Sequence, residues 1–402
     1  MDQLPQTQEA VPPAADKTRP SPVRLFLAFL RLGLTAFGGP AMVTYIGRLA
    51  VEKKRWLTKE SFEAGVALCQ SIPGATAMQT AAYVGLRAGG PSGALAAFVG
   101  FGLPAFVLMV VLAAVYHQTR DLAPVLAAFH GLHVVVVALI ANAAFNFGLS
   151  SLRNWRDAFL ATGAAAFLVL HGNPIIAIVG AAALGLLLYH GVASPEAEWP
   201  AEAADGPRRP LRFAAGLVAC VAAGLATLFF LDRMLFALAL LMLKIDLFAF
   251  GGGFASVPLM LHEVVDARAW LDDQTFMDGI ALGQVTPGPI VITATFIGYQ
   301  VAGLAGAVAG TVGIFTPSFL MVLATVPYFD RLQRSLLFRR ALRGVLVSFV
   351  GLLAAVAVNF ALAVSWSIPS VILAVATLVA LRLKVDILWV VLAAAIASVL
   401  IL

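Results

Sequence analysis

The chain alternates long apolar runs with short polar stretches, and the runs have the length of membrane-crossing helices. At about 20 residues per span, the apolar length after Leu25 suffices for on the order of ten to fifteen membrane segments. A polar, Pro- and Ala-rich tail, residues 1–24, precedes the first run, and the polar segment 194–212 divides the rest into two blocks. The pattern predicts an all-α polytopic membrane protein with a cytoplasmic, disordered tail and a cytoplasmic linker.

The two blocks repeat one another. RLGLTAFGGPAMVTYIG from Arg31 matches KIDLFAFGGGFASVPLM from Lys244, which places AFGG on AFGG. The order continues with QSIPG at 70–74 against QVTPG at 284–288. Order and spacing are both preserved, so we interpret the chain as a tandem duplication. The repeats are predicted at 25–193 and 232–402.

Equivalent loops of the two repeats carry opposite charge signatures. Residues 48–60 hold five basic side chains, whereas the equivalent stretch 262–278 holds one, Arg268, among five acids. The next pair reverses this, because 116–124 contains only Arg120 and 328–343 contains five arginines. Cytoplasmic loops collect Lys and Arg. The second repeat is therefore predicted to be inverted in the membrane relative to the first.

An inverted repeat needs an odd number of crossings between equivalent points. The apolar run 213–231 has no counterpart before the first repeat and is predicted to be the extra span. With loop 48–60 inside, segments 92–116 and 124–147 go out and back. The protein is therefore predicted to span the cell inner membrane, with its N-terminus in the cytoplasm and its C-terminus outside.

Composition narrows the class of protein. The chain of 402 residues is 61% hydrophobic and only 12% charged, which excludes a cytosolic enzyme. The net charge of +5 resides in short stretches between apolar runs and gives no reason to expect nucleic acid. Cys69 and Cys220 have no CxxC spacing and no clustered His, so we expect packing roles, with no disulfide, metal or cofactor.

Each repeat contains two apolar segments that are interrupted by residues unsuited to a helix. Such breaks expose peptide groups, which survive at membrane depth only inside protein or beside a wet cavity. Matching breaks in two halves point to a transporter's binding site, where the N-terminus of a half-helix suits an anion. Close helix packing at Gly pairs is the alternative. The predicted substrate-binding positions at the breaks are Gly38, Gly39, Pro40, Gln70, Pro73, Gly74, Thr76, Gly251, Gly252, Gly253, Gln284, Thr286, Pro287 and Gly288.

Two cations occupy the same repeat position, and six residues separate each of them from the Gly pair that follows it. Arg31 and Lys244 would be brought toward one centre by a two-fold axis in the membrane plane, and two cations suit a dianion. Snorkelling to the interface is the alternative, more so for Arg31 than for Lys244. Both are predicted substrate-binding residues.

Asp246 and Glu263 are the candidates for coupling to an ion. Asp246 has no acidic counterpart, since Gly33 stands at its repeat position, and it could neutralise Lys244 or carry a proton. Glu263, with His262 and Asp266, also fits a solvated loop face. His130, His133 and His171 have no evident partner and are interpreted as satisfied histidines rather than ligands.

These residues resemble the chromate ion transporter family of the long, two-domain type. The resemblance covers essentially the whole chain beyond the tail, and it rests on FLRLGLTAFGGP (29–40), RW (55–56), QSIPGA (70–75), KIDLFAFGGG (244–253), WL (270–271) and GQVTPGP (283–289). It implies export of chromate across the inner membrane, driven by the proton motive force and conferring resistance, with sulfate as a competitor. It also implies Arg31, Lys244 and the glycine–proline breaks as substrate residues.

Three classes of function compete. A secondary transporter for chromate, sulfate or another oxyanion is the leading interpretation, with protons as coupling ion and assembly as a homodimer left open. An uncoupled oxyanion channel would use similar backbone groups. A membrane-embedded enzyme is the third class, but no haem, flavin or metal signature supports a reductase, so we expect no enzyme.

Overall fold

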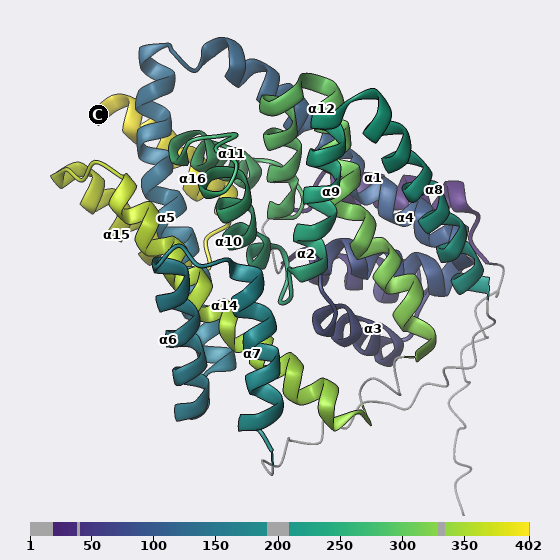
Figure 1. Ribbon diagram of the computed structural model, residues 1–402. Coiled ribbons are helices and arrows are strands. Elements are labelled where there is room, and N and C mark those ends of the chain that lie inside the picture. Colours follow the sequence, from purple (N-terminus) through teal and green to yellow (C-terminus); the bar gives the residue numbers. More distant parts are fainter. Residues whose placement is uncertain (1–18, 38–40, 191–208, 329–333, 402) are drawn as a thin grey trace, which may run out of the picture.

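The structure of the chain is a computed structural model that describes residues 19–37, 41–190, 209–328 and 334–401. These residues form helices and no strand (Figure 1). Most of the predicted tail and linker, and the predicted site residues Gly38, Gly39 and Pro40, lie outside the described residues. The first helix begins at Pro22 and the helix after the linker at Arg209, so helical structure extends into both predicted polar segments.

The two repeats fold into the same series of elements. The first repeat comprises α1 (Pro22–Gly33), α2 (Ala41–Gly47), the π-helix η1 (Arg48–Lys53), α3 (Lys59–Ser71), α4 (Thr76–Thr119), α5 (Ala123–Ser151), α6 (Trp155–Val169) and α7 (Pro174–Leu188). After α8 (Arg209–Leu231), the second comprises α9 (Arg233–Phe248), η2 (Gly253–Ala255), α10 (Ser256–Met260), the π-helix η3 (Leu261–Asp266), α11 (Asp273–Val285), η4 (Ile290–Ile292), α12 (Thr293–Thr325), η5 (Val326–Tyr328), α14 (Leu336–Ala363), α15 (Ile368–Arg382) and α16 (Ile387–Ile401).

Capping side chains set the first residues of equivalent helices in the two repeats. α3 and α11 begin 214 residues apart, each after a capping side chain. Thr58 Oγ1 accepts from the N–H of Ser61 at 3.2 Å, and Asp272 Oδ1 accepts from that of Thr275 at 2.7 Å. Such caps satisfy N–H groups that the first turn of a helix leaves free. The duplication read from the sequence is therefore a duplication of structure.

The breaks at SIPGA and VTPGP are the tips of re-entrant helical hairpins. α3 has 13 residues, about 20 Å, which is too short for a hydrocarbon core of about 30 Å. The start of α4 runs back along α3, because Tyr83 Oη donates to the carbonyl of Ser61 at 3.1 Å. Likewise, Thr293 Oγ1 in α12 lies 3.5 Å from the carbonyl oxygen of Gly279 in α11. Both segments therefore enter the membrane region and return.

A second reversal follows within α4 and within α12. Gly90 has φ 73° and Gly303 has φ 59°, a conformation that glycine adopts without a Cβ penalty. A Cβ on Gly85 would lie 2.3 Å from the carbonyl oxygen of Gly93, although residues eight apart in a straight helix are about 12 Å apart. The chain therefore folds back at Gly90, and the rest of α4 is the long crossing helix.

Five described helices are long and apolar enough to cross a membrane: α4, α5, α8, the segment 290–328 that contains α12, and α14. The halves are interlocked around these helices. α6 and α7 of the first repeat pack on α14, whereas α15 and α16 of the second repeat pack on α5. The fold is thus a polytopic all-α membrane protein with two halves in an inverted repeat, as the sequence predicted.

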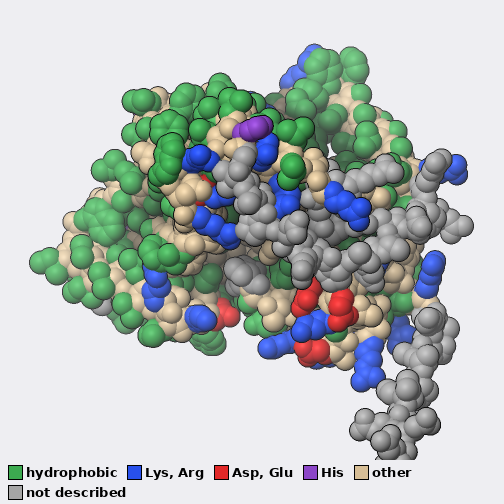
Figure 2. Space-filling model, turned by 90° about the horizontal axis from the view of Figure 1, so that it is seen from below, with side chains coloured by type: hydrophobic (Ala, Val, Ile, Leu, Met, Phe, Trp, Pro, Cys, Tyr) green, Lys and Arg blue, Asp and Glu red, His purple; other side chains and the backbone are tan. Residues whose placement is uncertain are grey.

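Two faces follow from this arrangement. We call the face where α7 ends and α14 begins the basic face; it lies at the bottom of Figure 1. Figure 2 shows Lys and Arg side chains spread over it, with acidic side chains in fewer places. The opposite face is the one where α4 ends and α5 begins.

Candidate functional site

The tip of the first re-entrant hairpin is held by the second repeat. The N–H of Gly74 donates to the carbonyl oxygen of Ala249 at 2.9 Å. The N–H of Ala75 donates to Ser318 Oγ at 2.9 Å, and this hydroxyl donates to Asp246 Oδ2 at 2.8 Å. Ser318 and Asp246 are fully buried. A polar relay therefore joins the broken backbone of one half to a carboxyl group of the other.

The N-terminus of α4 lies next to this relay. Gln79, fully buried in the first turns of α4, donates from Nε2 to the carbonyl of Pro73 at 2.5 Å. Its Oε1, like Oδ1 of Asp246, is buried and has no hydrogen-bond partner among the described residues. Buried polar atoms are normally paired. Two unpaired acceptor oxygens near a helix N-terminus therefore mark a place where a proton, water or another hydrogen-bond donor can bind.

The glycine run of the second repeat lies against the same tip. Gly251 and Gly252 have φ of 92° and 97°, and a Cβ on Gly252 would lie 3.4 Å from Thr76 Oγ1. The predicted site residues Gly74 and Thr76 of the first repeat thus lie close to Gly252 of the second. Gln70, in contrast, is exposed.

The tip of the second hairpin is related to the first but lacks the relay. Gly288 has φ 131°, and a Cβ there would lie 2.8 Å from the Cβ of Ala105. Ala105 occupies the repeat position of Ser318, and Gly33 that of Asp246. Thr286 instead donates to the carbonyl of Gly283 at 2.9 Å. The polar centre is therefore asymmetric.

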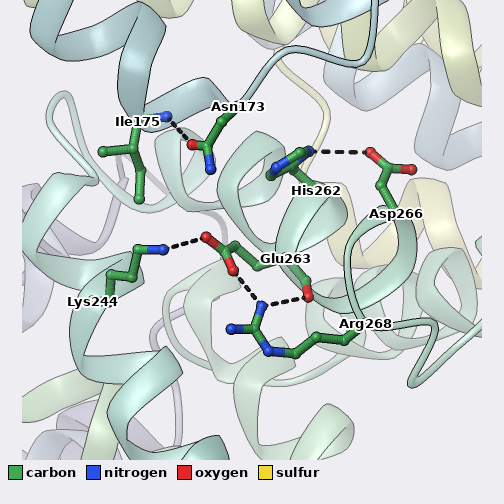
Figure 3. Close-up of polar contacts among 7 residues, drawn as sticks. All are labelled: Asn173, Ile175, Lys244, His262, Glu263, Asp266 and Arg268. Atoms are coloured by element: carbon green, nitrogen blue, oxygen red, sulfur yellow. Dashed lines mark hydrogen bonds and ion pairs between the residues drawn. The ribbon is translucent and has the colours of Figure 1, made fainter.

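Lys244 is paired with Glu263 rather than with Asp246 (Figure 3). Its Nζ lies 2.5 Å from Glu263 Oε1, and Arg268 binds the other carboxylate oxygen and, at 3.1 Å, the backbone carbonyl of Glu263. Glu263 is 3% exposed, so the prediction of a solvated loop face was wrong for this residue. The idea that Asp246 neutralises Lys244 was also wrong, because Asp246 is bound by Ser318.

The two cations at equivalent repeat positions have different surroundings. Arg31 is exposed in the last turn of α1. The Lys244 side chain is 41% exposed beside a buried carboxylate. Two cations around one carboxylate leave a net positive charge at Lys244, Glu263 and Arg268, and this charge can attract an anion.

Several residues that matter here were not found from the sequence. Ser318 and Gln79 supply the side-chain bonds at the first tip, and Ala249 supplies a carbonyl. Ser318 had a detectable signal, a hydroxyl next to Pro317 where the first repeat has Ala105. His133 also has a partner, since its Nε2 lies 2.6 Å from Asp278 Oδ1. Among the described residues there is no group of three or more His, Cys, Asp or Glu side chains that could hold a metal ion.

Inverted repeats with discontinuous segments that meet between the halves are the architecture of secondary transporters. Comparison with known proteins agrees with this class. The sequence model of the chromate transporter family matches residues 23–186 and 236–399, one range in each repeat. The chain therefore belongs to the chromate transporter family and is a multi-pass membrane protein.

Individual relatives cover nearly the whole chain. An uncharacterised transporter of Methanocaldococcus jannaschii is 44% identical over 379 residues, 94% of this chain and 93% of the relative. The chromate transport protein of Pseudomonas aeruginosa is 34% identical, over 90% of this chain and 86% of the relative. That of Cupriavidus metallidurans is 32% identical, over 90% and 88%. No solved structure matches the chain significantly.

Proposed function

We propose that this protein exports chromate across the cell inner membrane, driven by the proton motive force, and so confers chromate resistance. The observation that carries the proposal is the meeting of the first hairpin tip with Ser318 and Asp246 of the other repeat. Two relatives that match most of the chain are named chromate transport proteins. Sulfate, a tetrahedral dianion of similar shape, is the expected competitor.

The N-terminus of α4 is the proposed anion site. The first N–H groups of a helix have no partner within it, and the helix dipole adds partial positive charge there. Thr76, the first residue of α4, has its hydroxyl next to Gly252 at this point, and the net positive charge around Lys244 favours the approach of a dianion. Arg31, Lys244, Gln70, Gln284 and the glycine, proline and threonine positions of the four breaks remain the proposed substrate residues.

Asp246 is the proposed coupling residue of this site. Its Oδ1 is buried and unpaired within the described part of the chain, near the end of α4 that would receive the anion. Two negative charges close together in a dry site repel each other strongly. Anion binding and the protonation of Asp246 would therefore depend on each other. Glu263 is the weaker candidate, because Lys244 and Arg268 already neutralise it.

The orientation of the protein is also proposed. Lys and Arg mark cytoplasmic loops, so the basic face is assigned to the cytoplasm, with the N-terminus on that side and the C-terminus outside. Assembly as a homodimer stays a prediction from the sequence.

The test is chromate accumulation in sensitive cells that express the protein, with and without a protonophore and with sulfate as competitor. We expect lower accumulation of Cr(VI), lost on addition of the protonophore. Protonophore-insensitive flux would instead support an uncoupled channel, and conversion to a lower oxidation state would support an enzyme. Unchanged or increased accumulation would remove chromate export from the proposal.

A variant pair tests the coupling residue. Asp246→Asn keeps the acceptor for Ser318 but cannot carry a charge, and we expect it to abolish protonophore-sensitive export. Asp386→Asn, an exposed acid at the start of α16, is the matched control and should behave as the wild type. Protonophore-sensitive export by a well-expressed Asp246→Asn variant would exclude Asp246 as the coupling residue.

A further inference from the structure

A cluster of titratable side chains joins the two repeats near the opposite face. Asp278 of α11 accepts a hydrogen bond from Tyr116 Oη at 2.7 Å, and its other oxygen lies 2.6 Å from His133 Nε2. Tyr116 lies in the last turn of the first repeat's α4, and His133 lies in the first half of α5. Asp278 is 7% and His133 9% exposed. The cluster is a buried contact between the halves, outside the proposed chromate site.

A cluster of the same design joins the halves near the basic face. Asp157 of α6 accepts from Tyr189 Oη at 2.5 Å and from Arg343 of α14 at 2.8 and 3.2 Å. Both clusters therefore consist of a carboxylate, a tyrosine and a cationic or ionisable side chain from the other repeat. His133 lies 18 residues before the end of α5, about 27 Å along a helix, and Asp157 follows that end. The two clusters thus bracket a hydrocarbon core of about 30 Å.

The two clusters differ in one property. Arginine keeps its charge at all physiological pH values, whereas an imidazole changes charge between about pH 5 and 8. Of the two clusters, the one at the opposite face therefore contains the proton-binding imidazole.

Protons can reach His133 from the opposite face. A cavity of about 200 Å³ is lined by Tyr116, His133 and Asp278. The other charged or titratable groups that line it are Arg120, Asp121, His130 and Asp272. α16, which also packs on α5, has no titratable side chain. His133 is thus the buried imidazole that faces a carboxylate of the other repeat.

We propose that His133 is a proton-binding site that controls the contact between the two repeats at the opposite face. With Nε2–H directed at Asp278, an incoming proton binds Nδ1 and produces an imidazolium beside the carboxylate. The neutral imidazole has no charge to attract the carboxylate, whereas the imidazolium and the carboxylate attract each other as opposite charges. Protonation therefore closes this contact, and loss of the proton lets the halves separate more readily here.

This inference rests on the proposed function, because it assigns a step of coupled export to a residue. After chromate has left toward the opposite face, a proton enters the cavity, binds His133 and favours the conformation that is closed on that face. A ligand shifts a conformational equilibrium only through its different affinity for the two states. The proton is that ligand here, and its better partner is Asp278 in the closed state.

The test uses the full-length protein in liposomes with chromate as substrate. Two fluxes are measured: uptake driven by a pH gradient, and chromate–chromate exchange without a gradient. In His133→Gln, which can still donate to Asp278 but cannot gain charge, we expect the ratio of gradient-driven flux to exchange to fall about tenfold, within the range of single coupling sites. His117→Gln, the same change at an exposed residue next to Tyr116, should keep the wild-type ratio.

Each outcome is informative. Gradient-driven flux in the wild type with an unchanged ratio in His133→Gln would overturn the role of His133 and leave the proposed function intact. Absence of gradient-driven flux in the wild type would instead overturn the proposed proton coupling. If His133→Gln does not fold, Tyr116→Phe retains both ionisable partners while removing one donor to Asp278. We expect it to shift the pH midpoint of exchange, and an unshifted midpoint would overturn the inference.

Discussion

The N–H of Gly74 and the carbonyl of Ala249, 2.9 Å apart, join the broken segments of opposite repeats. Each residue lies at a point where its own helix has ended, so neither group has a helical partner. The bond satisfies both groups at membrane depth, where an unpaired peptide group is costly. Any motion of one repeat against the other must keep this bond or replace it with a bond to substrate or water.

The hydroxyl of Ser318 should be needed for both stability and transport. Ser318→Ala removes the acceptor of the Ala75 N–H and the donor to Asp246. Leaving a buried N–H unpaired costs about 1–3 kcal/mol, so we expect a lower unfolding temperature and a loss of chromate flux. Thr316→Ala is the control, because the partner of the Thr316 hydroxyl among the described residues is the carbonyl of Val312 in its own helix. Equal flux in the two variants would contradict the importance of the relay.

Lys244 should be required for more than the neutralisation of Glu263. Lys244→Ala is expected to abolish transport while the protein still reaches the membrane, because the positive charge for the dianion is lost. The double variant Lys244→Ala/Glu263→Gln removes both members of the pair. It should remain inactive in a flux assay. Restored flux in the double variant would show that Lys244 serves only to balance the buried carboxylate.

The contact between Asp157 and Arg343 should stabilise the fold except in strong acid. Burial opposes the ionisation of Asp157, but hydrogen bonds from Arg343 and Tyr189 outweigh it and hold the pKa below the ordinary value of 3.8. Because the folded-state pKa is lowered, this stabilisation is complete above the ordinary value and is lost as pH falls through the folded value. Arg343→Ala leaves a buried carboxylate without its cation, which costs about 3 kcal/mol.

Thermal unfolding of the purified protein at several pH values checks this expectation. The difference in unfolding temperature between wild type and Arg343→Ala should be large at pH 7 and should shrink below pH 4. Arg153→Ala removes an exposed arginine near the same carboxylate but keeps the backbone N–H that donates to Asp157. It should unfold like the wild type. A pH-independent difference would contradict the role of the Asp157 charge.

The architecture could be predicted from the sequence because its signals are repeated. AFGG at two places 213 residues apart, and opposite charges in equivalent loops, define an inverted duplication without reference to any contact. Hydropathy alone did not separate crossing helices from re-entrant ones. That distinction depends on pairs such as Ser61 and Tyr83, 22 residues apart, which become neighbours only when the chain folds back.

The candidate site was predicted less completely than the fold. The breaks at Gly74 and Gly252 could be located, because Gly and Pro have strong backbone preferences. The hydrogen-bond partners of the side chains could not be located in this way. Lys244, for example, binds Glu263 and not Asp246, which is nearer in the sequence. In the sequence Asp246 is two residues from Lys244, but residues two apart on a helix do not face each other. The same rule could have excluded that pairing in advance.

The chain reversal at Gly303 should depend on the absence of a side chain at Gly298. A Cβ on Gly298 would lie 2.1 Å from the carbonyl oxygen of Gly306, and both belong to rigid helical backbone. Gly298→Ala must therefore separate the two arms of α12, and overpacking of this kind costs about 1–3 kcal/mol. We expect a lower yield of folded protein and a lower unfolding temperature. Gly163→Ala is the control, because a Cβ at that position on α6 would have no described atom beyond its own helix backbone within 4 Å. If both variants unfolded at the same temperature, the close approach of the two arms at Gly298 would not be what holds the reversal.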